Sequence, residues 1–520
     1  MTAKVQFETL GDVTRTHALR YGSKAALKFD GRTTSYAELD RLSNRVANRL
    51  AEGVARGSRV AWLSKNNDLY YVLLLGAAKA GVTLVPLNWR LAAPEIRWII
   101  ADAQPDMVIV ADEFERLVAH AGIEHGNVWT LTDAQSAQPG ERDFTNWIAG
   151  GSESDPRIAI DPDDTAIQLY TSGTTGHPKG AMLSHRALLA FRGLPPEAQP
   201  AWNRWQNDDV SLIAMPQFHI GGTGFGLQTL CAGATGLVVR EFDPAQVLRL
   251  VDEERLSKIF AVPSALQMLV DQPGVRDVDF SRIKSILYGA SRIPLPLLRE
   301  AMDVFGCGFV QQYGMTEACG TICVLPPEDH DPAGNDRMTS AGKPLDGVEI
   351  AVLDETGSPV PAGERGEIAV RTPSVMSGYW RRPDATEEAF TDDGWFRTGD
   401  GGHLDENGYL YVGDRVKDMI VSGGENIYPA EIETVLAEHP DVREAAVIGL
   451  PDKKWGEAVC AVISANPGAA QDEEAMRDWL RGRIAGYKIP KAIRWLDPLP
   501  RNASGKILRR ELRALYSPAD

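Results

Sequence analysis

Apolar and polar residues alternate with two different periods along the first part of the chain. Short apolar runs, which predict buried strands, lie at residues 60–64, 82–86, 107–111, 165–170, 259–263 and 285–289. Segments that predict helices lie at residues 35–50, 73–80 and 184–191. Ser35 and Glu38 open the first of these with the spacing of a capping box. This alternation predicts parallel sheets covered by helices, with ligands bound where strands end in loops.

The pattern changes from about residue 342 onward. Residues 342–412 contain short alternating runs separated by Gly, Pro, Asp and Glu, which predict antiparallel strands and a small β-barrel. After residue 417, helical patterns return at 430–438 and 473–484, with a strand at 444–450. We therefore expect an α/β protein whose C-terminal part is a separate, smaller α+β domain.

Composition and charge narrow the functional class. The chain has 520 residues, of which 43% are hydrophobic and 24% charged, as in globular proteins of about three domain-sized units. Its net charge of −17 argues against nucleic-acid binding, so an anionic substrate such as ATP needs locally concentrated Lys and Arg. The five scattered cysteines favour reduced thiols over a disulfide framework or a zinc ribbon.

Neither the N-terminus nor the most apolar run of the chain suggests export or membrane insertion. The N-terminus lacks an apolar signal core. The most apolar run, residues 70–86, is interrupted by Lys79 and two glycines and is shorter than the ~20 residues of a membrane span. It predicts a buried helix followed by a strand. We expect a cytoplasmic protein with no membrane span, and the sequence leaves peripheral membrane contact open.

Residues 170–180, Tyr-Thr-Ser-Gly-Thr-Thr-Gly-His-Pro-Lys-Gly, carry the strongest chemical signal. Glycines let the backbone turn its N–H groups toward an anion, and the four hydroxyls and Lys179 add donors and a positive charge. The segment differs from a Walker A loop because Pro178 precedes the lysine and Gly180 follows it. It therefore predicts a polyphosphate site; the alternative is a flexible Gly/Ser/Thr surface loop.

Four later segments carry weaker signals. The ring of Tyr313 can stack on a base, and Glu317 can hold magnesium that bridges phosphates. Asp400 follows a turn and offers two acceptor oxygens for the hydroxyls of a ribose. Residues 413–433 are dense in charge and glycine, as in an interdomain hinge. Lys506 projects from an Asn-Ala-Ser-Gly turn. Taken singly, each segment also has a plainer interpretation: a solvated Glu, a plain turn, a charged linker and a solvated terminal Lys.

Together and in this order, the five segments resemble those of the adenylate-forming superfamily. The match spans nearly the whole chain and is most similar to the acyl-CoA synthetase branch, in particular to bacterial fatty-acid–CoA ligases. The resemblance implies an N-terminal domain over residues 1–413, with two helix-flanked sheets and a β-barrel at about 342–413. It also implies a hinge at 414–418 and a mobile C-terminal domain at 419–520.

The resemblance assigns a role to each motif position. The residues expected around the β- and γ-phosphates of ATP are Thr171, Ser172, Gly173, Thr174, Thr175, Gly176 and Lys179. Those expected around the adenosine and the α-phosphate are Gly289, Ala290, Gln312, Tyr313, Thr316, Asp400 and Arg415. Glu317 is the implied magnesium ligand, Lys417 the hinge and Lys506 the catalytic lysine, with Thr316 and Glu317 assisting it. The implied cofactors are ATP, Mg²⁺ and coenzyme A.

The residues of the acyl pocket leave the substrate open. His219 stands where relatives that activate amino acids have an Asp for the amino group, so the resemblance implies that it packs on an acyl group, unless it is a structural core histidine. Gly289 is a further expected pocket residue. Glycines at Gly221, Gly222, Gly224 and Gly226 suggest room for a bulky or elongated acid. A fatty or other apolar monocarboxylate is expected, with a benzoate- or cinnamate-type acid as the alternative.

Other functions are compatible with some or all of these motifs. A luciferase-like oxidation of the adenylate would use the same residues, and a nucleotide-binding regulator without turnover would not need Lys506. A peptide synthetase is not expected, because no carrier-protein segment follows residue 516. Pro500, Gly505 and Lys506 also resemble the Pro-x4-Gly-Lys pattern that bacterial lysine acetyltransferases modify, so such an enzyme is a possible partner.

Overall fold

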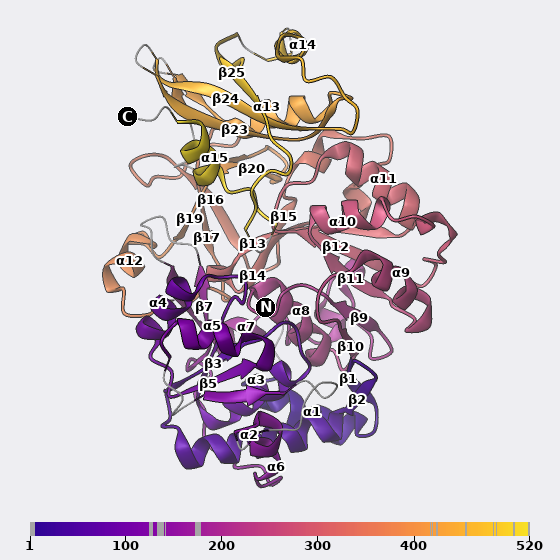
Figure 1. Cartoon of the computed structure of the whole chain (residues 1–520), viewed down its shortest axis with the longest axis vertical. Coiled ribbons are helices and arrows are strands. Elements are labelled where there is room, and N and C mark those ends of the chain that lie inside the picture. Colours follow the sequence, from indigo (N-terminus) through magenta and orange to yellow (C-terminus); the bar gives the residue numbers. More distant parts are fainter. Residues whose placement is uncertain are drawn as a thin grey trace.

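The computed structural model describes most of the chain at residue level. The described residues are 6–123, 128–132, 140, 142–171, 178–415, 418, 420–422, 425–452, 455–481, 483–484, 486–502 and 505–517. Figure 1 shows the N-terminal elements at the bottom and the C-terminal ones at the top. The predicted Lys417 and the run Ser172 to Gly176 lie outside the described residues.

A seven-stranded, largely parallel sheet forms the first layer. Its strand order is β18-β8-β7-β4-β3-β5-β6. The strands, in chain order, are β3 (Arg59–Leu63), β4 (Thr83–Pro86), β5 (Met107–Ala111), β6 (Val128–Leu131), β7 (Thr165–Thr171), β8 (Lys179–Ser184) and β18 (Gly378–Tyr379). β3 to β7 pair in parallel, whereas β8 runs antiparallel to β7 and β18 antiparallel to β8.

A nine-stranded sheet forms the second layer, in the order β15-β14-β13-β12-β11-β9-β10-β1-β2. Its strands are β1 (Ala25–Phe29), β2 (Arg32–Ser35), β9 (Val210–Ile213), β10 (Thr235–Val238), β11 (Lys258–Ala261), β12 (Ser285–Gly289), β13 (Gly308–Met315), β14 (Gly320–Leu325) and β15 (Lys343–Pro344). The strands from β1 to β13 are parallel in that order, and the edge strands are antiparallel.

Helices α3 (Leu69–Ala80) and α8 (Ile220–Cys231) pack against each other within one core that contains residues of both sheets. Every residue of α3 is buried. Tyr71 donates a hydrogen bond to Gly222 O at 3.0 Å, and the hydroxyls of Tyr70 and Thr223 lie 2.6 Å apart. Because buried polar groups cost free energy unless they are paired, these contacts fix the position of α8.

The capping-box prediction is confirmed at helix α2 (Tyr36–Gly53). Ser35 Oγ accepts a hydrogen bond from Glu38 N at 3.2 Å, which satisfies a donor of the first turn.

The structure explains the lysine within the apolar run at residues 70–86. Lys79 is fully buried, and its ammonium contacts Asp40 Oδ1 of α2 at 2.6 Å. The apolar run is a buried helix followed by a strand, as predicted. Across the described ranges, no helix has the length and apolar character needed to span a bilayer.

The remaining helices of the N-terminal part flank the two sheets (Figure 1). They are α1 (Leu10–Tyr21), α4 (Ala93–Ala103), α5 (Glu115–His120), α6 (Phe144–Ala149), α7 (His185–Leu189), α9 (Pro244–Glu253), α10 (Pro263–Val270), α11 (Leu295–Phe305) and α12 (Pro383–Glu388). The prediction of helix-covered, mainly parallel sheets is therefore confirmed.

The region predicted as a β-barrel is an antiparallel sheet. Its strands are β16 (Glu349–Leu353), β17 (Gly366–Arg371), β19 (Phe396–Leu404) and β20 (Leu410–Arg415), in that order. The antiparallel prediction is correct. The described strands do not close into a barrel, because β16 and β20 stand at opposite edges and do not pair.

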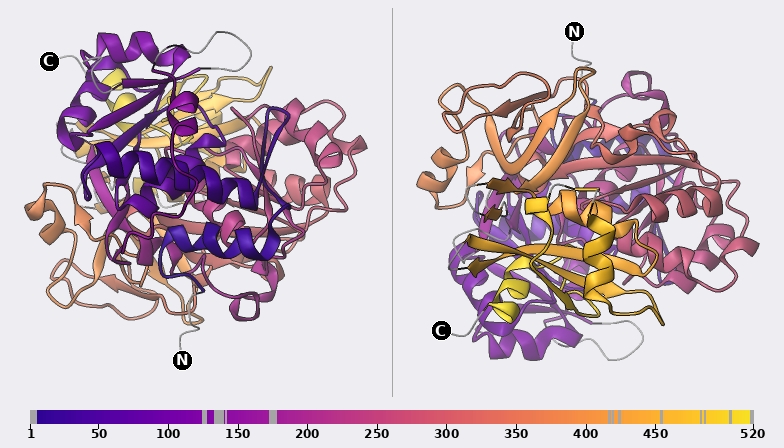
Figure 2. Two further views of the ribbon diagram at one scale, coloured as in Figure 1. Left: turned by 90° about the horizontal axis from the view of Figure 1, so that it is seen from below. Right: turned by 90° about the horizontal axis from the view of Figure 1, so that it is seen from above.

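The C-terminal part has its own sheet and its own core. Its strands are β21 (Ile420–Ser422), β22 (Glu425–Ile427), β23 (Val442–Asp452), β24 (Gly456–Ala465) and β25 (Ala492–Trp495), and its helices are α13 (Pro429–Ala437), α14 (Glu473–Leu480) and α15 (Arg509–Tyr516). Residues of β23, β24 and α13 form a separate apolar cluster. From above, these elements lie across the body of the molecule (Figure 2).

One local prediction differs from the structure. The sequence predicts a strand at 165–170 and a helix at 184–191 with the phosphate-type segment between them, but Lys179 begins a further strand, β8, which pairs back on β7 before α7 starts. Strand pairing across the sheet decides this outcome, and local hydropathy does not contain that information.

Candidate active site

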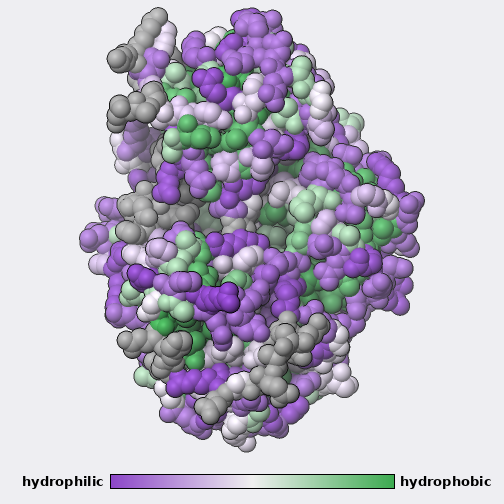
Figure 3. Space-filling view, viewed as in Figure 1, coloured by the Kyte–Doolittle hydropathy of each residue, from purple (hydrophilic) through white to green (hydrophobic). Residues whose placement is uncertain are grey.

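A cavity of about 1590 Å³ lies where the C-terminal part meets the two large sheets. Figure 3 shows the surface hollowed between the upper and the lower parts of the molecule. The described, predicted site residues that line this cavity are Thr171, Lys179, His219, Gly221, Ala290, Gln312, Tyr313, Thr316, Glu317, Asp400 and Lys506. They come from segments far apart in the sequence, so the fold brings together most of the site that the motifs predicted.

Tyr313 and Asp400 are directly bonded. Tyr313 stands on β13, and its hydroxyl donates a hydrogen bond to Asp400 Oδ2 on β19 at 2.8 Å. Burial, reinforced by the carboxylate, raises the pKa of Tyr313 well above its usual value, so the phenol keeps its proton. The Asp400 N–H bonds to Thr398 Oγ1 at 3.1 Å, which anchors the aspartate backbone. The arrangement places an aromatic ring and a two-oxygen acceptor side by side, as adenine and ribose require.

Glu317 follows β13 in a short 3-10 turn and faces the phosphate-type segment. Its Oε1 accepts hydrogen bonds from Thr171 Oγ1 and from the Tyr379 hydroxyl, each at 3.0 Å. Lys179 lies opposite Thr171 in the β7–β8 pairing, and its ammonium is 5.0 Å from the centre of the Tyr379 ring. One carboxylate, two hydroxyls and one lysine therefore converge beside the expected phosphate site.

Tyr379 is a site residue that the sequence motifs missed. It belongs to the short strand β18, which pairs with β8, so Tyr379 lies opposite Ala181. Its backbone N–H bonds to Thr386 Oγ1 at 2.9 Å, and Met376 N bonds to Glu317 O at 2.7 Å. The only local signal was the sequence Gly-Tyr-Trp after a strand, which carries no charge or nucleophile.

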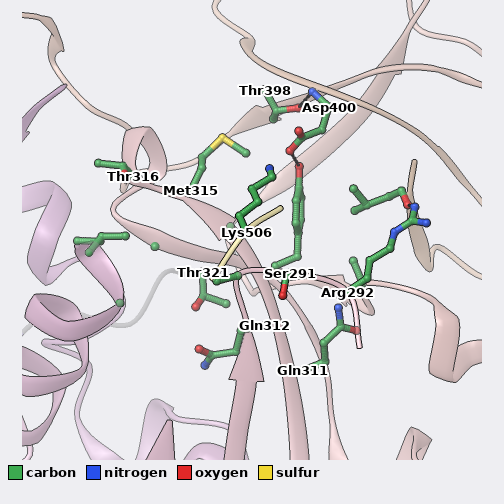
Figure 4. A pocket seen from close by; sticks show the side chains of 18 of the residues that line it. Ser291, Arg292, Gln311, Gln312, Met315, Thr316, Thr321, Thr398, Asp400 and Lys506 are labelled. Atoms are coloured by element: carbon green, nitrogen blue, oxygen red, sulfur yellow. Dashed lines mark hydrogen bonds between the residues drawn. The ribbon is translucent and has the colours of Figure 1, made fainter. Parts of the chain in front are cut away.

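Lys506 reaches the cavity from the C-terminal part. Asn502 holds its turn: Asn502 N donates to Lys506 O at 2.8 Å, and Lys506 N donates to Asn502 Oδ1 at 2.9 Å. Gly505 supports the turn with φ of 80°, a conformation that favours glycine. Figure 4 shows the Lys506 side chain extending toward Asp400 and Thr398, beside Met315. The turn thus carries an ammonium into the same cavity as Glu317.

His219 precedes helix α8 at the cavity wall. Its ring lies 4.6 Å from the ring of Phe218, and its Nε2 is buried and has no hydrogen-bond partner among the described residues. Burial lowers the pKa of His219 to about 4, so the imidazole is neutral at pH 7. A neutral ring at this place suits an uncharged group of a substrate.

The glycines of α8 have different reasons to be glycine. A Cβ at Gly222 would lie 2.3 Å from Pro216 O, and one at Gly226 only 1.9 Å from the Tyr71 hydroxyl. At Gly224 the same atom would meet Arg192 Nη2 at 2.4 Å. Gly221 lines the cavity, and its added Cβ would contact Phe260 at 3.1 Å. The expected room near His219 therefore applies to Gly221 and Gly224, which both line the cavity, although Gly224 also makes space for Arg192. Gly222 and Gly226 accommodate neighbouring groups.

The remaining predicted positions differ in how they meet the cavity. Gly289 ends β12, where a Cβ would lie 2.2 Å from Gln312 O, so a close approach of backbones explains the glycine. Its neighbour Ala290 lines the cavity with a left-handed φ of 66°. The β19–β20 register places the backbone of Arg415 opposite Asp400, and the Arg415 side chain is outside what the structure describes.

One cavity therefore contains an aromatic ring bonded to a carboxylate, a second carboxylate beside two hydroxyls, and two lysines from different parts of the chain. This set of groups suits a nucleotide with a polyphosphate. Residues 14–380 match the family model described as AMP-binding enzyme, and residues 431–506 match the model of the AMP-binding enzyme C-terminal domain. The chain belongs to the AMP-binding enzyme family, in its acyl-CoA synthetase branch.

Relatives and solved structures agree with this assignment. A fatty acid–acyl-carrier-protein ligase of Streptomyces coeruleorubidus is 41% identical over 516 residues, 98% of this chain and 96% of the relative. A feruloyl-CoA synthase of Amycolatopsis sp is 39% identical over 501 residues, 94% and 96% of the two chains. ATP-bound MatB from Rhodopseudomonas palustris shares 34% identity, with a TM-score of 0.88 over 97% of this chain and 99% of the other.

Proposed function

We propose that the enzyme joins ATP and a carboxylic acid into an acyl-adenylate with release of pyrophosphate, and then transfers the acyl group to the thiol of coenzyme A with release of AMP. The observation that carries this proposal is the position of Lys506. Its turn belongs to the C-terminal part, yet its side chain shares one cavity with Glu317, Tyr313 and Asp400.

Charge is the main obstacle to the first step. A carboxylate is ionised at pH 7 and needs no general base, but it must approach a polyphosphate of the same sign. Its oxygen forms a bond to the α-phosphorus while the bond to the pyrophosphate oxygen breaks. Lys506 would stabilise the charge that develops there, and Lys179 would bind the departing pyrophosphate. Thr316 would contact the α-phosphate.

Glu317 is the proposed magnesium ligand. Mg²⁺ in nucleotide sites is held by one or two carboxylates together with substrate phosphates and water, and a single glutamate beside two hydroxyls fits that donor set. No group of three or more His, Cys, Asp and Glu residues gathers to hold a metal in the described part of the chain. When bound, the ion would neutralise phosphate charge, and Thr171 and Tyr379 would orient the carboxylate.

Domain movement is proposed between the two steps. The proposed boundaries are an N-terminal domain at 1–413, a hinge at 414–418 that includes Lys417, and a C-terminal domain at 419–520. The structure has a TM-score of 0.88 against ATP-bound MatB and 0.79 against the apo form, which supports an arrangement suited to adenylation. Rotation about the hinge would withdraw Lys506 before the thiol attacks, because a few residues at an element boundary can absorb such a change.

The acid is proposed to have an apolar body. The apolar and aromatic side chains that line the acyl side of the cavity include Phe191, Trp205, Met215, Phe225, Phe260 and Leu287. Neutral His219 offers no negative charge to an ammonium group. A fatty or other apolar monocarboxylate fits this wall, and an aromatic acid is the alternative, with one relative of each kind.

The acceptor thiol has a second candidate. Coenzyme A is proposed because the chain resembles CoA ligases, whereas the relative from Streptomyces coeruleorubidus transfers to an acyl-carrier protein. Both thiols end in the same phosphopantetheine arm.

We also infer a cytoplasmic location, which fits the five free cysteines. Acetylation of Lys506 is proposed as a means of control, because it would remove the positive charge of this side chain.

One assay tests the proposal. Pyrophosphate release is measured across fatty and aromatic acids, each without thiol, with coenzyme A and with a holo carrier protein. We expect release with at least one acid and a thioester with coenzyme A. If a thioester formed only on the carrier protein, the acceptor would be the carrier protein and not coenzyme A. Light or peroxide chemistry in place of a thioester would indicate a luciferase-like reaction, and no release with any acid would contradict the proposal.

A further inference from the structure

One face of helix α8 forms a wall of the acyl cavity. Gly221, Gly224, Phe225 and Gln228 of α8 line the cavity at spacings of three or four residues, which place them on one face, and His219 lines it just before the helix begins. His219 stands at the start of this face and Gln228 nine residues later, a rise of about 13 Å along the helix. The face is apolar between them, since glycines and Phe225 fill it. Gln228 is therefore a polar residue at the inner part of an apolar wall.

The Gln228 side chain is partly buried and lines the cavity. Its amide nitrogen, Nε2, is buried and has no hydrogen-bond partner among the described residues. A buried donor without an acceptor is costly, and native proteins keep few of them. Because Gln228 lines the cavity one turn after Gly224, rotation of the amide about its last side-chain bond can turn the nitrogen toward a bound acid. An acceptor atom supplied by a bound acid would satisfy it.

Arg192 adds a second polar group beside the same helical turn. It follows α7, and its guanidinium donates hydrogen bonds to the backbone carbonyls of Leu188, Gly224 and Cys319, at 3.0, 3.0 and 2.7 Å. Within the described ranges, no carboxylate pairs with this guanidinium, although it lines the cavity. A guanidinium has five N–H donors, so the positive charge and the remaining donors also favour an oxygen acceptor nearby.

We propose that the acyl cavity selects acids that carry an oxygen acceptor on the tail, away from the reacting carboxylate, and that Gln228 binds this oxygen with Arg192 beside it. This inference rests on the proposed ligase function. The surrounding apolar wall requires that the rest of the acid be apolar. A hydroxyl is the best probe, because it can accept from the amide nitrogen and donate to the amide oxygen.

The test compares acids that differ by one oxygen. The pairs are 4-hydroxycinnamate with cinnamate, and 10-hydroxydecanoate with decanoate, and kcat/KM is measured from pyrophosphate release. We expect the hydroxylated member of one pair to be preferred about tenfold or more, since a site built to bond a hydroxyl rejects the analogue that lacks it. The pair that shows the preference identifies an aromatic or an aliphatic body.

Two variants separate recognition from packing. Gln228→Leu keeps the approximate size and removes the amide, so the preference is expected to fall to about one, through a lower kcat/KM for the hydroxylated acid alone. Unchanged kcat/KM for the unsubstituted acid shows that the variant is folded. Gln267→Leu is the matched control: this glutamine also lines the cavity, but its Nε2 already donates to Asp271 Oδ1 at 2.9 Å. It should keep the preference of the original enzyme.

Two results would overturn the inference: equal kcat/KM within both pairs, or a preference that survives Gln228→Leu. A failure of the ligase function looks different, because then no acid of the panel, hydroxylated or not, releases pyrophosphate; the inference would fall with it.

Discussion

The hydroxyl of Tyr313 donates a hydrogen bond to Asp400 across 87 positions of sequence. The two residues stand on different sheets, β13 and β19, and each was expected to contact a different part of ATP. Their bond means that the ring expected to stack on adenine and the carboxylate expected to bind ribose form one unit. A change at either residue should therefore affect the binding of the whole nucleoside.

Tyr313→Phe should raise the KM for ATP about tenfold. The variant keeps the ring and removes one hydrogen bond to a carboxylate, which is worth about 1.5 kcal/mol. The KM for the acid should change little. Tyr288→Phe is the matched control, because Tyr288 is buried and bonded to His330 at 2.9 Å away from the cavity lining. An unchanged KM for ATP in Tyr313→Phe would show that the bond does not organise the nucleotide site.

Tyr379→Phe should shift the dependence of activity on magnesium. Without its hydroxyl, Glu317 loses one of two side-chain donors, so the carboxylate is less well oriented and more Mg²⁺ is needed for half-maximal pyrophosphate release, by roughly three- to tenfold. Activity at saturating Mg²⁺ should largely return. Tyr409→Phe serves as control, since Tyr409 bonds to Asp329 at 2.9 Å outside the cavity. A loss of activity that magnesium does not relieve would argue against a positioning role.

Stability should fall as the pH is lowered from 7 to 5, in part because of His185. Burial lowers the pKa of His185 to about 4, and its Nδ1 accepts a hydrogen bond from Leu10 N at 3.3 Å. An unfolded histidine titrates near 6.5, so the unfolded state binds the extra proton in this range and the folded state loses about 2 kcal/mol. The contribution is complete above pH 6.5 and disappears toward pH 4.

Urea denaturation at pH 7 and pH 5 measures this effect. His185→Asn, which keeps an acceptor, should have a flatter dependence on pH, whereas His120→Asn at an exposed position should follow the original protein. An equally steep dependence in His185→Asn would assign the acid sensitivity to other groups.

Adjacent glycines of α8 should respond differently to alanine. Gly222→Ala puts a methyl group 2.3 Å from a backbone oxygen and should destabilise the fold by about 2 kcal/mol or more. In Gly221→Ala the added methyl group would lie 3.1 Å from Phe260, a side chain that can shift slightly. The protein should therefore stay folded and discriminate more strongly against bulky acids. Thermal denaturation and an acid panel check both. Similar losses of stability in the two variants would contradict the assignment of Gly221 to the cavity.

Local hydropathy was sufficient to predict the bounds of a strand where the strand is apolar and bounded by turn residues. The predicted ranges 107–111 and 285–289 coincide with β5 and β12. It was insufficient for α3, which begins at Leu69, four residues before the prediction, because a helix buried on all sides has no amphipathic period. It also missed β8, whose evidence is the pairing with β7.

The candidate site was predictable where a motif carries charge or hydroxyls in a fixed spacing, as for Lys179, Glu317 and Asp400. Tyr379 and Gln228 were not predictable, because a lone tyrosine or glutamine has no local chemical signature. Their proposed roles rest on the fold, which places Tyr379 beside the carboxylate of Glu317 and Gln228 in the lining of the cavity.

The central claim is that Lys506, carried by the C-terminal part, serves the adenylation step. The most direct test measures the two half-reactions of Lys506→Ala separately. We expect pyrophosphate release from acid and ATP to fall by about two orders of magnitude or more, as for loss of a group that stabilises transition-state charge. Thioester formation from prepared acyl-adenylate and thiol should stay near that of the original enzyme. Arg510→Ala, an exposed cation of the same part, should change neither. Pyrophosphate release by Lys506→Ala within a few-fold of the original enzyme would contradict the account.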